Sequence, residues 1–204
     1  GTGATNSIVG LGFQPCVLFV KSRIFSGGAL TTYAEVEGTV YGKIVGSNGG
    51  TTGDLTFDAG GFTCISTSTF LNAVGEVYYF CALSRDIEDC DTFLWVGDGT
   101  DNRTVGSLGF TPDIGFAFAT NTQRGPYWTS DTHGADVSQP LNNGAGAAAN
   151  HLQSLVAGGI QVGTAENGSG VTYIGIGLKK KARVCVTASY TGTGSDDVPV
   201  AHTL

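Results

Sequence analysis

The sequence LGFQP at residues 11–15 returns as LGFTP at residues 108–112. Further matches follow each copy in the same order and at a period of about 100 residues. They are VLFV at 17–20 with IGFAF at 114–118, AGGF at 59–62 with AGGI at 157–160, and GEVYY at 75–79 with GVTY at 170–173. This period is the length of a whole small domain. We therefore predict two similar domains, residues 1–96 and 97–204, from an internal duplication.

The end of the chain resembles the start of a third copy. Residues 190–197 (YTGTGSDD) resemble residues 95–102 (WVGDGTDN), and residues 198–204 take the position of residues 104–108. A strand repeated at the end of a duplicated unit has two uses: it closes the second domain, or it pairs with a neighbouring subunit by strand addition. We predict one of these two roles for residues 198–204.

Strand patterns dominate the chain. Segments rich in β-branched and aromatic residues alternate with glycine clusters, as in antiparallel β-sandwiches and barrels. The pattern predicts strands at 16–20, 31–37, 39–45, 77–83, 92–96, 114–119, 171–178 and 182–190, and long loops at 47–54 and 121–146. The best helix candidate is the short alanine-rich segment at 146–155. We predict an all-β fold of two similar antiparallel β-sandwich lobes, of the jelly-roll or concanavalin-like type.

The net charge and the lack of long apolar runs limit the kinds of partner that the chain can bind. The formal net charge is −7, with 10 Lys and Arg against 17 Asp and Glu. An acidic surface of this kind argues against nucleic-acid binding. No run of eighteen apolar residues occurs, so we expect no membrane insertion. Residues 1–10 have neither a basic start nor an apolar core, so we expect no signal peptide there.

The spaced motifs resemble a repeat found in virion proteins of tailed bacteriophages. The second copy has GFTPD at 109–113, RGPYW at 124–128, GGIQVG at 158–163 and the Asn-Gly turn at 167–168. The first copy keeps GFQP at 12–15 and KSR at 21–23. It departs from the family by having Cys16 where Asp is usual and by lacking the Arg-Gly aromatic loop. The resemblance spans most of the chain and implies a concanavalin-like β-sandwich in a tail, fibre or capsid-surface protein, without a catalytic site.

The function that this resemblance implies is structural. We expect a non-enzymatic virion protein, a capsid decoration or a tail or fibre component, which mediates assembly on the virion surface and attachment to the host. The expected partners are other virion chains, further copies of the chain as a homo-oligomer, and a host-surface glycan. We expect no cofactor.

The candidate binding residues are Arg124, Tyr127 and Trp128. Aromatic residues beside an arginine are favoured anchors in interfaces, and aromatic faces also stack on sugars. This loop supports an alternative function, a lectin-like carbohydrate-binding module in which Tyr127 and Trp128 line a groove. The simpler interpretation is that Trp128 covers the sandwich core.

A second alternative is a jelly-roll glycoside hydrolase. Glu35 and Glu37 lie two residues apart on a predicted strand, which would point both carboxylates to one face. Paired carboxylates supply the acid and the nucleophile of such enzymes. The second copy has no equivalent pair, so we favour an exposed acidic strand face. His133, beside Asp131 and Asp136, is interpreted as a surface histidine and not as part of a Ser-His-Asp site.

The five cysteines lack the paired spacing of a zinc site. Cys81 and Cys90 lie nine residues apart and either close a disulfide across a hairpin or remain buried thiols. Three acidic turns carry hard oxygen ligands of the kind that calcium prefers, although none has EF-hand spacing. They contain Asp86, Glu88, Asp89 and Asp91, then Asp98, Asp101 and Asn102, then Asp196 and Asp197. We interpret them as solvated turns.

Overall fold

The computed structural model describes residues 1–23, 30–44, 50–65, 71–85, 88–122, 126–141, 146–181 and 187. Its elements form two lobes. Lobe 1 contains β1 (Asn6–Val9), β2 (Pro15–Ser22), β3 (Thr31–Val36), β4 (Thr39–Ile44), β5 (Gly50–Thr52), β6 (Leu55–Asp58), β7 (Gly61–Cys64) and β8 (Tyr78–Ser84). Lobe 2 contains β9 (Cys90–Val96), β10 (Arg103–Val105), β11 (Ile114–Ala119), β12 (Tyr127–Ser130), β13 (Gln139–Pro140), β14 (Leu152–Val156), β15 (Gly159–Val162), the 3₁₀ turn η1 (Thr164–Glu166) and β16 (Thr172–Leu178).

Each lobe is a sandwich of a three-stranded and a five-stranded sheet. The small sheets have the orders β1-β7-β6 and β10-β15-β14. The large sheets have the orders β5-β4-β3-β2-β8 and β13-β12-β11-β16-β9. All pairings are antiparallel, as the alternating sequence pattern predicts. The fold class predicted from the sequence is therefore confirmed as all-β.

The central strands of the two large sheets share one register. In lobe 1, Phe19 of β2 lies opposite Cys81 of β8. In lobe 2, the matching Phe116 of β11 lies opposite Ile176 of β16. Two tyrosines also match, because Tyr78 of β8 and Tyr173 of β16 each accept a hydrogen bond from the backbone N–H five residues earlier. Strands β2 and β8 of lobe 1 thus correspond to β11 and β16 of lobe 2.

The two large sheets differ in whether a further strand, β9, lies beside the strand that pairs with the central one. β9 follows β8 in the chain, but it pairs along its whole length with β16 of lobe 2, from Cys90 opposite Leu178 to Val96 opposite Thr172. The predicted domain boundary between residues 96 and 97 therefore differs from the structure, in which the change of lobe comes before β9. Lobe 2 consequently has one strand beyond β16 that has no counterpart beside β8 among the described residues.

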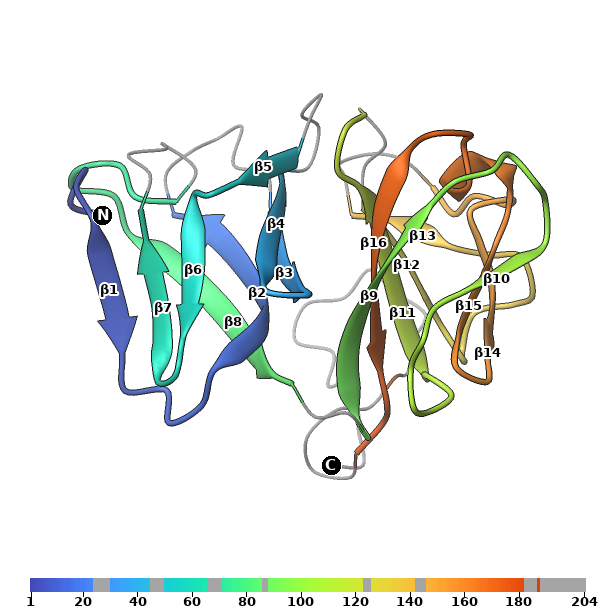
Figure 1. Cartoon of the computed structure of the whole chain (residues 1–204), viewed down its shortest axis with the longest axis horizontal. Helices are drawn as coiled ribbons and strands as arrows, with labels where there is room; N and C mark the ends of the chain where they lie inside the picture. The colour runs from blue at the N-terminus through green and yellow to red at the C-terminus, as the bar shows by residue number, and fades with distance from the viewer. Residues whose placement is uncertain are drawn as a thin grey trace, which may run out of the picture.

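Three apolar clusters hold four β layers together. The lobe 1 cluster lies between its two sheets and includes Leu18, Tyr33 and Phe62. The lobe 2 cluster lies between its two sheets and includes Trp95 and Tyr173. A third cluster joins the two large sheets face to face, with Val17 and Ala34 from lobe 1 and Phe118, Ile174 and Ile176 from lobe 2. The layers therefore follow the order three strands, five, five, three, and the two lobes lie side by side (Figure 1).

Several sequence predictions can now be compared with the elements. The predicted strands at 16–20, 31–37, 39–45, 77–83, 92–96, 114–119 and 171–178 coincide with β2, β3, β4, β8, β9, β11 and β16 within a few residues. The helix predicted at 146–155 is wrong, because its second half is strand β14. The predicted strand at 182–190, apart from Thr187, and the predicted closing strand at 198–204 lie outside the described residues. No helix in the described part of the chain has the length and hydrophobicity needed to cross a lipid bilayer.

Candidate functional site

The two predicted aromatic binding residues lie on β12 and point to opposite faces of the sheet. Tyr127 packs against the lobe 2 cluster and its ring stacks on His151, with centroids 3.7 Å apart. Trp128 faces the other way and contacts Phe116, with centroids 6.3 Å apart. Neighbouring residues of a strand alternate in this manner. Tyr127 and Trp128 therefore do not line one groove, and Arg124 lies outside the described residues.

Tyr127 stacks on His151, which belongs to a buried polar group in lobe 2. The Nδ1 atom of His151 lies 2.9 Å from Oε1 of Glu166, whose side chain is fully buried on η1. Lys43 of β4 is also fully buried, and its ammonium donates a hydrogen bond to the carbonyl of Thr122 in lobe 2. Burial lowers the pKa of Lys43, and the carboxylate of Glu166 acts in the opposite direction. Because a buried charge is costly unless it keeps its partners, this contact favours one arrangement of the two lobes.

The carboxylates considered for glycoside hydrolysis do not form a pair. Glu35 is on β3, but the strand ends at Val36, and Glu37 occupies the turn with a φ of 50°. Glu37 and Gly38 both have positive φ, as the two central residues of a type I′ hairpin turn require. The carboxylate of Glu35 accepts the N–H of Gly38 at 2.7 Å and contacts Arg85 at 3.2 Å. It is thus occupied in fixing the turn and the neighbouring loop.

Equivalent depressions open at the same end of both lobes. The depression in lobe 1 has a volume of about 480 Å³ and includes Glu35 in its wall. The depression in lobe 2 has a volume of about 250 Å³ and includes Asp131. These carboxylates follow Ala34 and Ser130, which lie opposite Val17 and Ile114 in the matched registers. Arg85 contacts Glu35, and Lys180 contacts Asp131, so both acids are paired with a cation.

His133 belongs to the wall of the lobe 2 depression. Its Nδ1 atom accepts the backbone N–H of Ser130 at 3.0 Å and lies 2.9 Å from the Ser130 hydroxyl. The ring also packs edge-on against Trp128, with centroids 4.7 Å apart. Ser130 is buried, with 4% of its surface exposed, so its hydroxyl is not presented to a substrate. These contacts show His133 closing a tight turn after β12.

Cys81 and Cys90 are both free thiols, so the disulfide, one of the two alternatives considered for them, is not formed, and only Cys90 is buried. They belong to different sheets, because β8 pairs with β2 in lobe 1 while β9 pairs with β16 in lobe 2. The hairpin that the prediction needed therefore does not exist. Cys90 instead lies beside Cys16 in the cluster between the lobes, with the two Sγ atoms 3.7 Å apart. Hydrogen bonding to Cys16 and burial raise the pKa of Cys90.

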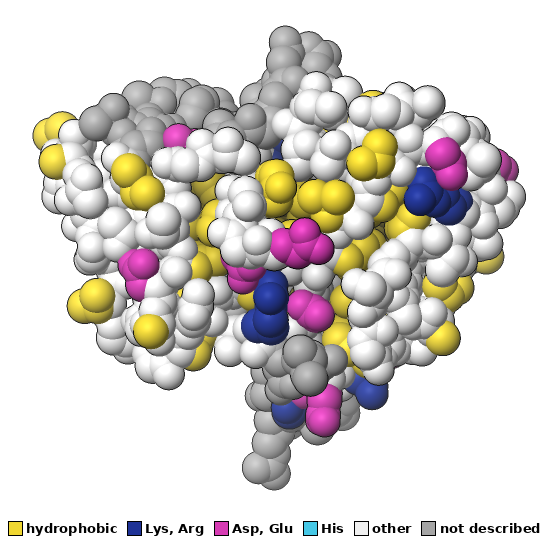
Figure 2. All heavy atoms as spheres, viewed as in Figure 1, with side chains coloured by type: hydrophobic (Ala, Val, Ile, Leu, Met, Phe, Trp, Pro, Cys, Tyr) yellow, Lys and Arg dark blue, Asp and Glu magenta, His cyan; other side chains and the backbone are white. Residues whose placement is uncertain are grey.

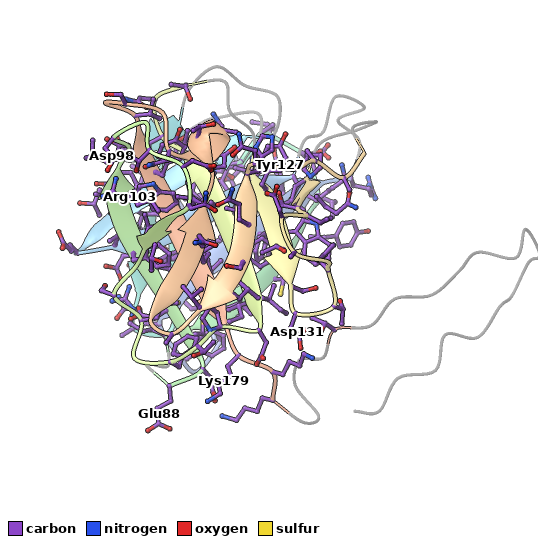
Figure 3. The ribbon with its side chains drawn as sticks, turned by 90° about the vertical axis from the view of Figure 1, so that its right-hand side faces the viewer. Glu88, Asp98, Arg103, Tyr127, Asp131 and Lys179 are labelled. Atoms are coloured by element: carbon purple, nitrogen blue, oxygen red, sulfur yellow. The ribbon has the colours of Figure 1, made fainter. Side chains whose placement is uncertain are left out.

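The acidic turns are engaged with basic and N–H groups. Asp89 contacts Lys181, and Asp91 lies 3.3 Å from Arg85. Asp98 lies 3.2 Å from Arg103, and Figure 3 shows these two side chains close together. Within the described residues, no three His, Cys, Asp or Glu side chains gather to hold a metal ion. Asp86, Asp196 and Asp197 lie outside those residues.

Apolar side chains are exposed in the middle of β8. Tyr79 is 63% exposed, Phe80 is 42% exposed, and the thiol-bearing Cys81 is also exposed. Hydrophobic side chains also gather on the face of the molecule seen in Figure 2, around a small group of acidic and basic residues. Sequence reasoning recognised β8 as a strand, but it did not identify it as a sheet edge, because the position of a strand in its sheet depends on β9.

The comparisons add no further constraint. Neither protein-family models, nor curated proteins, nor solved structures gave a match to this chain. The class that the geometry itself defines is an all-β protein of two sandwich lobes fused through their large sheets.

Proposed function

We propose that this protein is a non-enzymatic structural protein of a virus particle, a capsid decoration or a tail or fibre component, which works by association with other protein chains. The observation that carries the proposal is the exposed edge of β8, with Tyr79 and Phe80 open to solvent. An exposed apolar strand edge is a template for pairing with another chain, and folded proteins normally cover or charge such edges. The sequence resemblance to bacteriophage virion repeats supports the virion setting.

The candidate catalytic groups have structural tasks in this fold. Glu35 holds the β3–β4 turn and Arg85, and His133 holds the turn after β12. These contacts fix the turns at the ends of β3 and β12, which is a structural role. The paired depressions with Glu35 and Asp131 supply a second candidate, glycan binding at the host surface, since carboxylates accept hydrogen bonds from sugar hydroxyls.

Two measurements test the structural proposal. Light scattering of the purified chain at high concentration should show association, and mass spectrometry of particles from its source should detect the protein. A pure monomer that is also missing from the particles would overturn the proposal.

The activity test uses the double variant Glu35→Gln with Glu37→Gln. We expect no polysaccharide cleavage by the parent and unchanged assembly of the variant. Cleavage that the double variant loses would establish the hydrolase instead. Specific binding on a glycan array, lost on Glu35→Gln and Asp131→Asn while association persists, would establish the lectin-like function.

A further inference from the structure

The edge of β8 is incomplete when it is compared with β16. Both strands lie beside the matching central strands β2 and β11, but β16 has β9 on its other side. Among the described residues, β8 pairs only with β2. The backbone groups on its open side thus face away from the sheet, next to the exposed rings of Tyr79 and Phe80.

A cavity of about 310 Å³ lies along this edge. Its apolar wall includes Ile8, Val20, Phe62 and Phe80. In lobe 2 the corresponding residues Val105, Ala117 and Ile160 belong to the cluster that also contains Phe93 and Trp95 of β9. The cavity of lobe 1 therefore lies where the side chains of β9 fill lobe 2.

The sequence after β16 repeats the sequence of β9. Cys90, Thr92 and Trp95 recur as Cys185, Thr187 and Tyr190, and GDG at 97–99 recurs as GTG at 192–194. The same spacing relates Tyr78 of β8 to Tyr173 of β16. The register of β9 on β16 can therefore be transferred without a shift. It sets Thr187 opposite Cys81, as Thr92 lies opposite Ile176.

The sizes of the facing side chains support this register. Phe93 lies opposite Gly175, and a Cβ atom on Gly175 would come within 2.2 Å of the Phe93 ring. That pair thus has room for one large side chain. In the transferred register Phe80 takes the place of Gly175, and Ala188 takes the place of Phe93. The large residue has moved to the other strand, so the summed volume of the pair is kept.

We propose that β8 accepts residues 185–190 of a second copy as an added strand, in the antiparallel register that β9 has on β16. The donor is a second copy because Thr187 in its own chain donates a hydrogen bond to Asp131, at the end of β12 in lobe 2, at 2.8 Å. Main-chain pairing supplies the affinity of such a contact, and the filled cavity supplies its specificity. The contact joins two different surfaces, so it links copies head to tail.

This inference rests on the proposed function, since it names the partner through which copies associate. A cross-linking experiment on the full chain tests it. The variant Thr187→Cys should form a disulfide with the native Cys81 under mild oxidation. The bond would be seen as a ladder of oligomers on a non-reducing gel and, by mass spectrometry, as a peptide that joins Cys81 to position 187. Val186→Cys is the matched control, because its side chain would point to the other face of the strand.

Two results of this experiment would overturn the proposal. One is a bond between Cys81 and position 187 that is confined to the monomer, which would identify the chain's own segment as the occupant. The other is the absence of that bond, or an equal yield from Val186→Cys, which would show that the predicted register is not formed.

A size-exchange experiment tests the same contact without relying on thiols. Ala188→Phe places a second large ring against Phe80 and should weaken association at least about tenfold, as overpacking does in protein cores. Adding Phe80→Gly to that variant recreates the pair found in lobe 2 and should restore association. If Ala188→Phe has no effect, or if the double variant stays as weak as the single one, the proposed pairing is wrong.

A synthetic peptide of residues 183–192 separates this inference from the proposed function. Binding of the peptide to the parent and not to the disulfide-linked oligomer supports the strand contact, even if the protein is missing from virus particles and the virion role fails. Association of the chain without peptide binding would overturn the strand contact and leave the assembly role standing.

Discussion

Strands β8 and β16 occupy the same place beside their central strands, but their surroundings differ. β16 lies between two neighbours, and five of its seven residues are buried. β8 is an edge strand, and Tyr79, Phe80 and Cys81 in its middle are exposed. Their sequences follow this difference, because β16 has Gly175 where a ring of β9 approaches and β8 has Phe80. The presence of a further neighbouring strand, such as β9 beside β16, therefore decides how much of β8 or β16 is buried, more than the hydrophobicity of β8 or β16 itself.

The largest effect should come from removing the matching tyrosines. Tyr173→Ala should lower the free energy of unfolding by about 3–5 kcal/mol, because Tyr173 is fully buried and stacks on Trp95 at 5.0 Å. Tyr78→Ala should cost less, about 1–3 kcal/mol, because Tyr78 is only half-buried. Chemical denaturation of both variants at one low protein concentration measures the difference. Equal losses of unfolding free energy would mean that the packing of β9 on β16 adds nothing to the contribution of Tyr173.

Gly175→Ala should have the next largest effect. The added Cβ atom would overlap the Phe93 ring, so we expect a loss of about 1–3 kcal/mol in unfolding free energy. Phe93→Leu should make the same change less costly, because the ring that causes the overlap is gone. Thermal unfolding of the two single variants and the double variant measures this coupling. Additive losses would contradict the close contact between Phe93 and Gly175.

Removing only the hydroxyl of each tyrosine should cost the two lobes the same unfolding free energy. The hydroxyl of Tyr173 accepts the Gly168 N–H at 3.1 Å, and that of Tyr78 accepts the Ala73 N–H at 2.9 Å. Tyr173→Phe and Tyr78→Phe should therefore cost similar amounts, about 0.5–1.5 kcal/mol each. Denaturant titration should give values that agree within error. A much larger loss in one variant would show that the two turns are not equivalent.

The smallest effect concerns pH and the turn after β9. Hydrogen bonds from the hydroxyl and backbone N–H of Thr100, then from Asn167, with the nearby Arg103, lower the pKa of Asp98 to about 2. A depressed carboxyl pKa stabilises the fold above the unfolded value of 3.8, and this contribution is lost as the pH falls from about 4 towards 2. Asp98→Asn should flatten the stability curve over that range. Thr2→Ala, in the corresponding turn of lobe 1, should leave its slope unchanged.

The sequence predicted the long strands well, because their signals are local. β2, β11 and β16 are continuous runs of apolar and β-branched residues, and such runs are buried strands in most sandwiches. The short strands, β6, β7, β14 and β15 among them, were not predicted, because so few residues give only a weak pattern. β12 was placed inside a loop, since Tyr127–Ser130 is flanked by glycine and proline, and its strand conformation depends on pairing with β11.

The candidate site was harder to predict because it depends on contacts distant in sequence. Glu37 continues an alternating pattern, but the turn with Gly38 requires it to have a positive φ. Cys81 and Cys90 are near in sequence, and only the passage of the chain from one lobe to the other separates them. The duplication pattern could not have indicated that β9 pairs in lobe 2, because the sequence of β9 recurs after β16 and not before β1, which assigns β9 to the end of the first unit.

The passage of the chain from β8 into β9 also has a mechanical consequence. β9 is covalently continuous with lobe 1, and its backbone is bonded along its whole length to β16 in lobe 2. A pull that separates the lobes along the direction of β9 would load these hydrogen bonds together, since bonds between antiparallel strands are perpendicular to the strands. The connection between the lobes is therefore a shear joint, in which the load is shared across a ladder of bonds.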